Sequence, residues 1–190
     1  MSTTQESLYQ ELLALPEHTK GEIIAGRLYV SPKPAGPHIL AATNLGGELY
    51  QPFQRGHGGP GGWWVLDEPQ CYLDRDVLVP DLAGWRRTRM PEIPKDHRFE
   101  VAPDWVCEII SPGSRKIDRK LKPPVYLRSG VQYLWLLDPV ARELEVLRAQ
   151  GGAWVLVDSF YGDDLVRVEP FEAYEIDLLV LWGEERVIEQ

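Results

Sequence analysis

Cysteine is scarce in this chain, and long apolar stretches are lacking. The 190 residues include two cysteines, Cys71 and Cys107, too few for the disulfide framework of a small secreted domain. We expect both to be free thiols without a zinc site, because no ligand cluster accompanies them. No apolar run reaches the 18 residues that a membrane-spanning helix needs, and the N-terminal residues lack the basic start and apolar core of a signal peptide. These absences predict a cytoplasmic protein.

Positive charge is also scarce, with a formal net charge of −9. Proteins that bind nucleic acid non-specifically are usually basic, because neutralisation of phosphates supplies most of that affinity. The basic residues of this chain are concentrated in two short segments, 86–89 and 115–122. We therefore expect a locally positive rim on an acidic body, formed by Arg86, Arg87, Arg89, Arg115, Lys116 and Arg119.

The composition is that of one soluble globular domain, with 44% hydrophobic and 26% charged residues. We expect an N-terminal helical segment over 1–19, with a helix at 7–15, and a single domain over 20–190. A hairpin should turn at Ala25-Gly26 within 22–30, before a proline-rich loop over 31–37. An amphipathic helix is predicted over 38–53, and its Gly46-Gly47 pair is a sign of close packing on a sheet.

Strand patterns fill most of the remainder. We expect strands over 63–67, 70–73, 77–85, 104–111, 132–138, 142–147, 154–160, 165–168 and 174–178. A helix running to about Ser129 should join the strands 104–111 and 132–138 as a right-handed parallel βαβ unit. The predicted fold class is α/β (α+β): a mixed sheet, antiparallel at its edges, with flanking helices.

Two of these apolar runs contain a carboxylate where a buried strand should have none. Asp81 lies in Val77–Trp85, and Glu108 lies in Asp104–Pro112. An isolated buried carboxylate costs several kcal/mol or more, so it must be neutralised, paired or bound to a metal ion. Neighbouring strands could bring both to one divalent cation, and the basic segment 114–122 supplies an ammonium nearby. Two acids and a lysine around Mg²⁺ form a site that cleaves phosphodiesters.

The order of motifs resembles the Uma-type restriction endonuclease family of the PD-(D/E)XK nuclease superfamily. The residues that carry the resemblance run from about 20 to 182 and comprise Gly21-Glu22-Ile-Ile-Ala-Gly26, Ser31-Pro32 with His38, Leu66-Asp-Glu68-Pro69, Val79-Pro-Asp81-Leu-Ala-Gly-Trp85, Ala102-Pro-Asp-Trp-Val-Cys-Glu108-Ile-Ile-Ser-Pro112, Asp118, Lys122, Tyr126, Gly130-Val131 and Leu134-Trp-Leu-Leu-Asp138-Pro139. A Pro-Asp dipeptide alone would carry no weight, whereas this ordered set is specific.

The resemblance implies a restriction-endonuclease-like fold and a site that holds Mg²⁺, or Mn²⁺, on Asp81 and Glu108, to which Glu68 adds a carboxylate. Ile110 occupies the position where the superfamily usually carries its lysine, and the family supplies that lysine as Lys122 from the following helix. Asp118, Lys122 and Tyr126 would share one helical face.

Pro123 and Pro124 depart from the family pattern, because proline fits only the first turn of a helix. We therefore expect Lys122 at or before the helix start, with its ammonium nearest the two carboxylates, and Lys120 and Lys116 as substitutes.

The resemblance further implies a metal-dependent endonuclease acting on nucleic acid, most simply DNA, as a homodimer, with Glu22 and His38 in supporting positions. The prolines and the acidic surface favour an alternative, a non-catalytic module of the same fold for binding or assembly. A second alternative is a carbohydrate- or ligand-binding protein that uses exposed members of its seven tryptophans.

Overall fold

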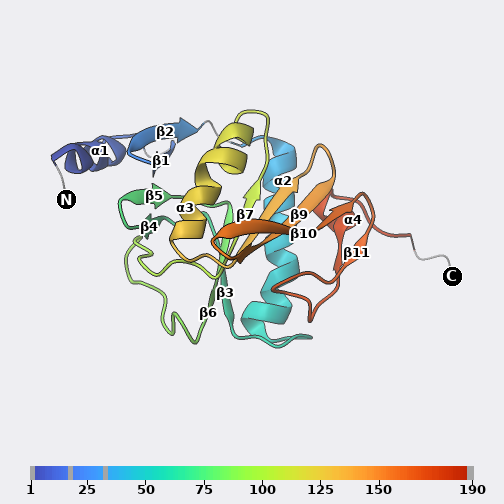
Figure 1. Cartoon of the computed structure of the whole chain (residues 1–190). Helices are drawn as coiled ribbons and strands as arrows, with labels where there is room; N and C mark the ends of the chain where they lie inside the picture. The colour runs from blue at the N-terminus through green and yellow to red at the C-terminus, as the bar shows by residue number, and fades with distance from the viewer. Residues whose placement is uncertain (1–2, 17–18, 32–33, 188–190) are drawn as a thin grey trace.

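A six-stranded mixed sheet forms the centre of the computed structural model, which describes residues 3–16, 19–31 and 34–187 (Figure 1). The strand order is β10-β9-β8-β7-β6-β3, and β7 and β8 are parallel whereas the other neighbours are antiparallel. The strands are β3 (Trp63–Asp67), β6 (Leu82–Arg86), β7 (Trp105–Ile109), β8 (Tyr133–Asp138), β9 (Glu143–Gln150) and β10 (Ala153–Tyr161). The predicted mixed α+β fold class is confirmed.

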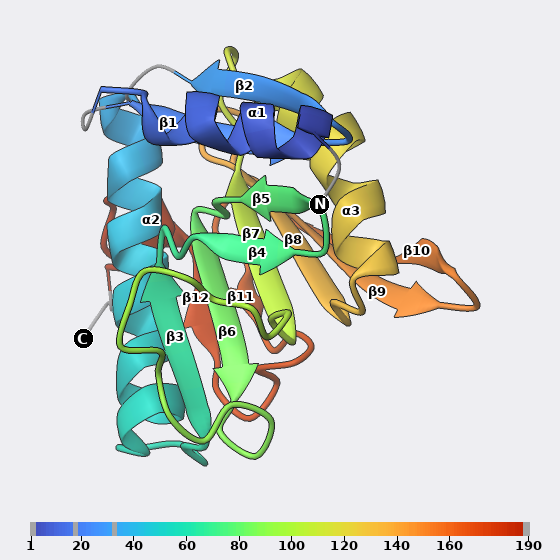
Figure 2. The ribbon, with the colours of Figure 1, turned by 90° about the vertical axis from the view of Figure 1, so that its left-hand side faces the viewer.

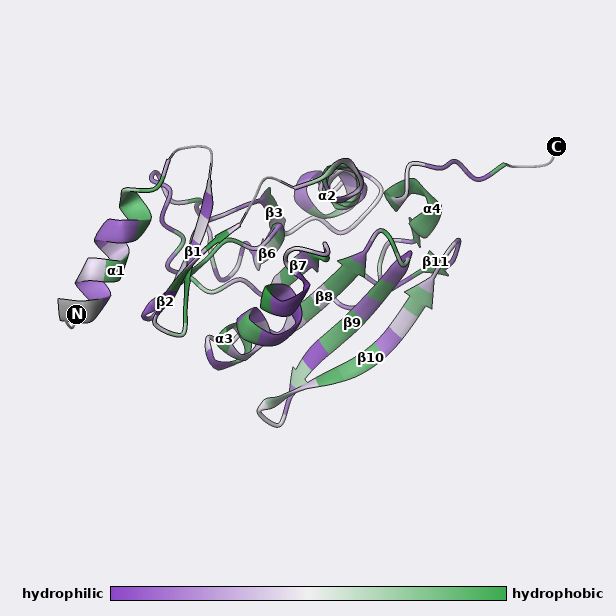
Figure 3. Ribbon diagram, turned by 90° about the horizontal axis from the view of Figure 1, so that it is seen from above, coloured by the Kyte–Doolittle hydropathy of each residue, from purple (hydrophilic) through white to green (hydrophobic). Residues whose placement is uncertain are grey.

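Two helices cover the two faces of this sheet. Successive side chains of a strand point to opposite faces, so Trp105, Cys107 and Ile109 of β7 pack with helix α2 (Gly36–Leu49). Val106 and Ile110 pack instead with helix α3 (Lys122–Arg128). Seen from above, α2 and α3 lie on either side of β7 (Figure 3). The predicted unit of strand, helix and parallel strand is confirmed by β7, α3 and β8. The first residues of the two parallel strands, Trp105 and Tyr133, pair with each other.

A four-stranded sheet lies against the first one and carries the N-terminal part of the chain (Figure 2). Its order is β2-β1-β5-β4, with β1 (Lys20–Ile24), β2 (Arg27–Ser31), β4 (Cys71–Leu73) and β5 (Asp76–Leu78). The β1–β2 hairpin turns at Ala25-Gly26, as predicted, and both residues have positive φ angles of 50° and 75°. Helix α1 (Thr3–Leu13) packs on this sheet through Leu12, which contacts Ile23 and Val77.

The stretch Val77–Trp85 is not the single strand that its apolar pattern predicts. It forms β5 and β6, which belong to different sheets and are joined by residues 79–81. Pro80 explains the break, because proline has no N–H to give to a strand ladder and is excluded from strand interiors. Asp81 consequently lies at the corner between the two sheets, immediately before β6, and not in the middle of a strand.

The remaining elements are short or peripheral. The π-helical segment η1 (Tyr50–Arg55) extends α2, and the segment η2 (Ile117–Leu121) precedes α3. Near the C-terminus lie β11 (Leu165–Val166), β12 (Ile176–Asp177) and the unpredicted α4 (Leu178–Leu181). Of the predicted proline-rich loop, Pro32 and Lys33 lie outside the described residues. Over the described ranges, every helix is too short or too polar to cross a membrane.

Candidate active site

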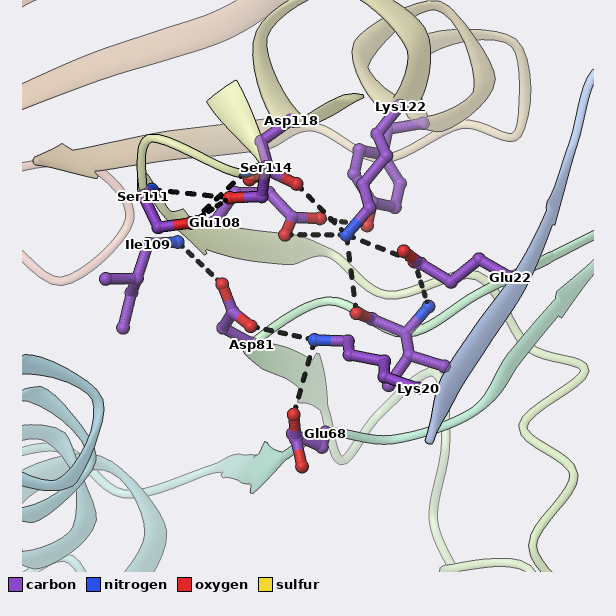
Figure 4. A network of polar contacts seen from close by, with 12 residues as sticks. Lys20, Glu22, Glu68, Asp81, Glu108, Ile109, Ser111, Ser114, Asp118 and Lys122 are labelled. Carbon is purple, nitrogen blue, oxygen red and sulfur yellow. Dashed lines mark hydrogen bonds and ion pairs between the residues drawn. The ribbon is translucent and has the colours of Figure 1, made fainter. Parts of the chain in front are cut away.

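Asp81, immediately before β6, and Glu108 of β7 lie at the same end of two paired antiparallel strands. Leu82 of β6 pairs with Cys107 of β7, so the next position outward on each side holds Asp81 and Glu108. The Asp81 side chain contacts His38 of α2, whereas the Glu108 side chain contacts Lys122 and Tyr126 on the α3 side. Both side chains are buried, with 5% of Asp81 and 0% of Glu108 exposed. The two acids lie at the same end of the central sheet, beside the β1 strand of the smaller sheet (Figure 4).

The ammonium of Lys122 lies among three buried carboxylates. Its Nζ is 2.9 Å from Oε2 of Glu108, 3.0 Å from Oε1 of Glu22 and 3.3 Å from Oδ1 of Asp118. Tyr126 donates a hydrogen bond from its hydroxyl to the other Glu108 oxygen. Lys122 is thus the lysine that contacts Glu108, as the sequence predicts, whereas Lys120 is exposed on the same helix.

Lys122 is the first residue of α3, at the helix start as predicted, but helical structure does not begin there. Helical structure runs without a break from Arg115 to Arg128, with the π-helical turn η2 in its middle. The N–H of Lys122 bonds to the carbonyl of Ile117, five residues back. The two prolines follow this wide turn at the first positions of α3, so the π-helical turn accommodates them within one run of helical structure. Asp118, Lys122 and Tyr126 therefore do share one face.

Asp81 has a different set of partners. Its Oδ1 accepts a hydrogen bond from Nζ of Lys20 at 2.8 Å and lies 3.3 Å from Nε2 of His38. Its Oδ2 accepts the backbone N–H of Ile109 at 2.7 Å. The Lys20 ammonium also lies 3.3 Å from Oε1 of Glu68 (Figure 4). Glu68 and His38 thus reach the site, as the resemblance implied.

Lys20 is the site residue that the sequence reasoning missed. It stands two positions before Glu22 on β1, and residues two apart on a strand point to the same face. That spacing was the available signal, because Glu22 was already a candidate. A neighbouring structural element ties Glu22 to the corner: Val79 donates its N–H to Oε1 of Glu22 at 2.8 Å.

Burial and crowding perturb the ionisation of these groups. Burial raises the pKa of Glu108 well above its ordinary value. The Lys122 ammonium opposes this shift, whereas the negative charges of Asp118 and Asp81 add to it. Burial opposes ionisation of Asp81 too, but the Lys20 ammonium and the hydrogen bond from His38 outweigh it and hold the pKa of Asp81 well below its usual range. Burial disfavours charge on Lys122, yet Glu108, Glu22 and Asp118 together raise the pKa of Lys122.

The donor chemistry of the site fits a hard divalent cation. Within the described residues, no group of three or more His, Cys, Asp and Glu side chains is arranged to hold a metal ion. Mg²⁺ does not require such a cage, because it keeps several waters and binds through one or two carboxylates together with substrate phosphate. Asp81 and Glu68 already hold a cation between them, namely the ammonium of Lys20.

The predicted positive rim does not surround this site. Arg86, Arg87 and Arg89 lie at or beyond the end of β6 that is remote from Asp81, where the guanidinium of Arg87 stacks on Trp64 at 3.8 Å. The prediction is wrong because an extended strand rises by roughly 3.3 Å per residue. Residues 86–89 are close to Asp81 in sequence but lie at the other end of β6.

Two further members of that rim carry paired charges. Arg115 pairs with Asp138 and Arg119 with Glu145. The site itself is acidic, with the carboxylates of five residues near two ammonium groups: Glu22, Glu68, Asp81, Glu108 and Asp118 against Lys20 and Lys122.

The tryptophans do not form an exposed binding surface. Trp63, Trp85, Trp105 and Trp135 are buried. The other three pack against the same cores as partly buried residues: Trp64, Trp154 and Trp182. This placement excludes the carbohydrate-binding alternative, which required exposed indole rings. Cys71 and Cys107 are buried free thiols in these cores.

Comparison with known proteins gives a family and solved structures of similar fold. Residues 9–180 match the model of the Uma2 family, described as putative restriction endonuclease. A putative nuclease from Anabaena variabilis ATCC 29413, assigned to DUF820, has a similar structure with a TM-score of 0.72 and 25% sequence identity. The alignment covers 92% of this chain and 96% of that one. No curated protein matches the chain.

Proposed function

Because this chain belongs to the Uma2 family of putative restriction endonucleases, we propose that it is a metal-dependent endonuclease that hydrolyses phosphodiester bonds in nucleic acid. The metal is Mg²⁺, which Mn²⁺ can replace, and the first substrate to test is DNA. Asp81 and Glu108 hold the metal, with Glu68 as a further carboxylate, and Lys122 is the catalytic lysine.

One observation carries this proposal above the others. Asp81 and Glu108 lie at the same end of the paired strands β6 and β7, and a buried lysine lies 2.9 Å from Glu108. Three buried charged groups from three separate segments are costly to assemble. Their convergence at the corner between the two sheets is better explained by chemistry than by stability.

The bound Mg²⁺ would polarise the phosphodiester and lower the pKa of a coordinated water. Lys122 contributes fixed positive charge. Because its carboxylate neighbours raise its pKa, it stays protonated at neutral pH and does not act as a general base. Its ammonium instead offsets the negative charge that develops on the phosphate oxygens.

Lys20 and His38 position Asp81. The Lys20 ammonium occupies Oδ1 of Asp81, and His38 lies 3.3 Å from the same oxygen. A metal ion held by Asp81 would compete with the Lys20 ammonium for this carboxylate, and Lys20 would then remain free to pair with Glu68, which it already contacts, or with the substrate phosphate. In either position the positive charge of Lys20 reduces the repulsion between the site carboxylates and the anionic substrate.

The experiment is a cleavage assay on DNA and RNA with Mg²⁺, with Mn²⁺ and with a chelator. The wild-type chain should cleave only with a divalent ion. Asp81→Asn and Glu108→Gln should each reduce the rate by at least about a hundredfold, the usual effect of losing a group that stabilises developing charge. Asp158→Asn, an exposed acid on β10, is the matched control and should leave the rate unchanged.

A folded wild-type chain that cleaves neither nucleic acid would favour the non-catalytic binding or assembly module. The acidity of the site is the observation that supports this second candidate. Lys20 and Lys122 compensate part of the buried negative charge without any metal. In that case Asp81→Asn would alter stability and leave no activity to lose.

A further inference from the structure

A groove of about 690 Å³ opens directly beside Asp81. One wall is the exposed side of α2 and η1, and the other is the β3 strand with Leu82. Glu68 and Asp81 stand at one end, so the groove is continuous with the proposed metal site. Its volume falls within the range of small-ligand pockets and is far too small for a double helix.

A pair of glycines in the last turn of α2, Gly46 and Gly47, keeps this groove open. Glycine inside a helix is destabilising relative to alanine, and close packing on the sheet was the expected reason for Gly46-Gly47. That expectation is wrong. A Cβ on Gly47 would meet no atom within 4 Å, and one on Gly46 would meet only Leu82 at 3.7 Å, an ordinary contact. Both glycines line the groove, so a larger side chain there would fill it.

The lining suits a flat, uncharged group with polar edges. Thr43 and Gln51 supply a hydroxyl and an amide, the exposed ring of Tyr50 supplies a stacking surface, and Val65 and Leu82 are apolar. Among the described residues that line the groove there is no lysine or arginine, whereas Asp67, Glu68 and Asp81 are acidic. A phosphate would be repelled here, but a nucleobase would be accepted through stacking and edge hydrogen bonds.

We infer that the groove receives the base of one unpaired nucleotide next to the scissile phosphate. The inference rests on the proposed function, because it places that phosphate at Asp81 and Glu108. A base that is paired within a duplex cannot enter a groove of this size. The preferred substrate is therefore single-stranded or locally unpaired nucleic acid, such as a loop, a mismatch or a flipped base.

The test is a groove-filling variant, Gly47→Leu, with Gly36→Leu as its matched control. Gly36 begins the same helix, and a Cβ there also meets no atom within 4 Å, but it does not line the groove. Because leucine favours the helix over glycine, Gly47→Leu should raise Tm by about 2–4 °C. Loss of binding can then not be ascribed to unfolding.

Binding is measured with a short single-stranded oligonucleotide that carries 2-aminopurine, with Ca²⁺ in place of Mg²⁺. The wild type and Gly36→Leu should bind it with equal affinity, and Gly47→Leu should bind about tenfold more weakly, the order of one stacked base. Cleavage by the wild type with Mg²⁺ should be at least about tenfold faster on the single strand than on the matched duplex.

Failure of the groove and failure of the nuclease proposal give different results. Equal oligonucleotide affinities for Gly47→Leu and Gly36→Leu, or equal cleavage of paired and unpaired strands, would overturn the groove inference while leaving the nuclease intact. Absence of all cleavage would overturn the nuclease, and the affinity comparison between the two leucine variants would still decide the groove.

Discussion

Lys122 is the residue whose surroundings define its role most narrowly. Its ammonium is buried among Glu22, Glu108 and Asp118, and the carbonyl of Val79 lies 3.5 Å away. A buried cation with three acidic neighbours cannot give up its proton easily, so its chemistry is restricted to supplying charge. Its removal must affect both the reaction and the fold, and the two effects can be measured separately.

Lys122→Met should lower the rate of Mg²⁺-dependent cleavage by about 10²–10³-fold. The same change should reduce the free energy of unfolding by about 3–5 kcal/mol, because it leaves buried carboxylates uncompensated. Urea unfolding and single-turnover cleavage measure the two quantities. Lys120→Met is the control, since that side chain is exposed. A variant pair in which Lys120→Met loses cleavage and Lys122→Met keeps it would show that the wrong lysine has been assigned.

The carboxylate cluster predicts an unusual pH dependence of stability without divalent ions. Burial raises the pKa of both Glu108 and Asp118, so above about pH 4, where these carboxyl groups ionise in the unfolded chain, the folded chain binds more protons than the unfolded chain. Where the folded state binds more protons, stability falls as pH rises. Tm should therefore decrease from pH 5 upward, and Glu108→Gln should flatten that decrease. A wild-type profile no steeper than that of Glu108→Gln would contradict the assignment.

At the residue scale the sequence predicted most of the cluster. Asp81 and Glu108 stand out because acids are costly in apolar strands, and Lys122 follows from the resemblance to the family. Lys20 gave little sign, because a lysine at the start of a strand is ordinarily solvated. Only the folding of β1 against the 79–81 corner brings its ammonium to Asp81, and this is a contact across 61 residues of chain.

At the scale of elements, the helix from Arg115 to Arg128 determines where Lys122 lies. Two serines fix its beginning. The N–H of Ser114 bonds to Oγ of Ser111 at 3.2 Å, and the N–H of Ser111 bonds to Oγ of Ser114 at 3.3 Å. This reciprocal arrangement matches a capping box, in which two groups without helical partners satisfy each other.

Ser111→Ala should lower the free energy of unfolding by about 1 kcal/mol, the usual cost of losing an N-terminal cap. In a chain of this size the corresponding decrease in Tm is about 2–4 °C. Differential scanning calorimetry measures it, and Ser111→Gly should cost only a few tenths of a kcal/mol because glycine is tolerated at caps. Identical stabilities of wild type and Ser111→Ala would show that this capping does not hold the helix.

Two errors at this scale have the same origin in proline. The sequence suggested one strand over 77–85 and a lysine at or before the start of its helix, whereas helical structure already begins at Arg115. In the structure Pro80 divides the strand between two sheets, and Pro123-Pro124 are accommodated by the π-helical turn η2. Local rules correctly state that proline interrupts hydrogen bonding. They do not state whether the chain ends the element, bends it or widens it by one residue, because tertiary packing makes that choice.

At the scale of the whole molecule, the sequence led to a wrong prediction of where the positive charge lies. The net charge of −9 and the acidity of the site both oppose the approach of phosphates, and the arginines at 86–89 lie at the far end of β6. The basic residues closest in sequence to Lys122 are partly consumed in ion pairs. Under the proposed function, a divalent cation would compensate the carboxylates before an anionic substrate binds.

Affinity for single-stranded DNA should depend strongly on divalent ions. We expect the Kd to be at least about tenfold larger in a chelator than in Ca²⁺ at the same ionic strength. We also expect the affinity to decrease as the concentration of monovalent salt rises. Fluorescence anisotropy measures both. Binding that is unaffected by the chelator would place the nucleic acid away from Asp81 and Glu108.

The homodimer, the cytoplasmic location and the single domain over 20–190 stay predictions.

The most direct measurement of the central claim is a crystal structure of the chain soaked with Mn²⁺, with anomalous scattering used to locate the ion. The account predicts one strong site, with an oxygen of Asp81 and an oxygen of Glu108 each about 2.0–2.2 Å from the ion, and Nζ of Lys20 displaced from Asp81. An ion bound elsewhere, with Lys20 still 2.8 Å from Asp81, would contradict it.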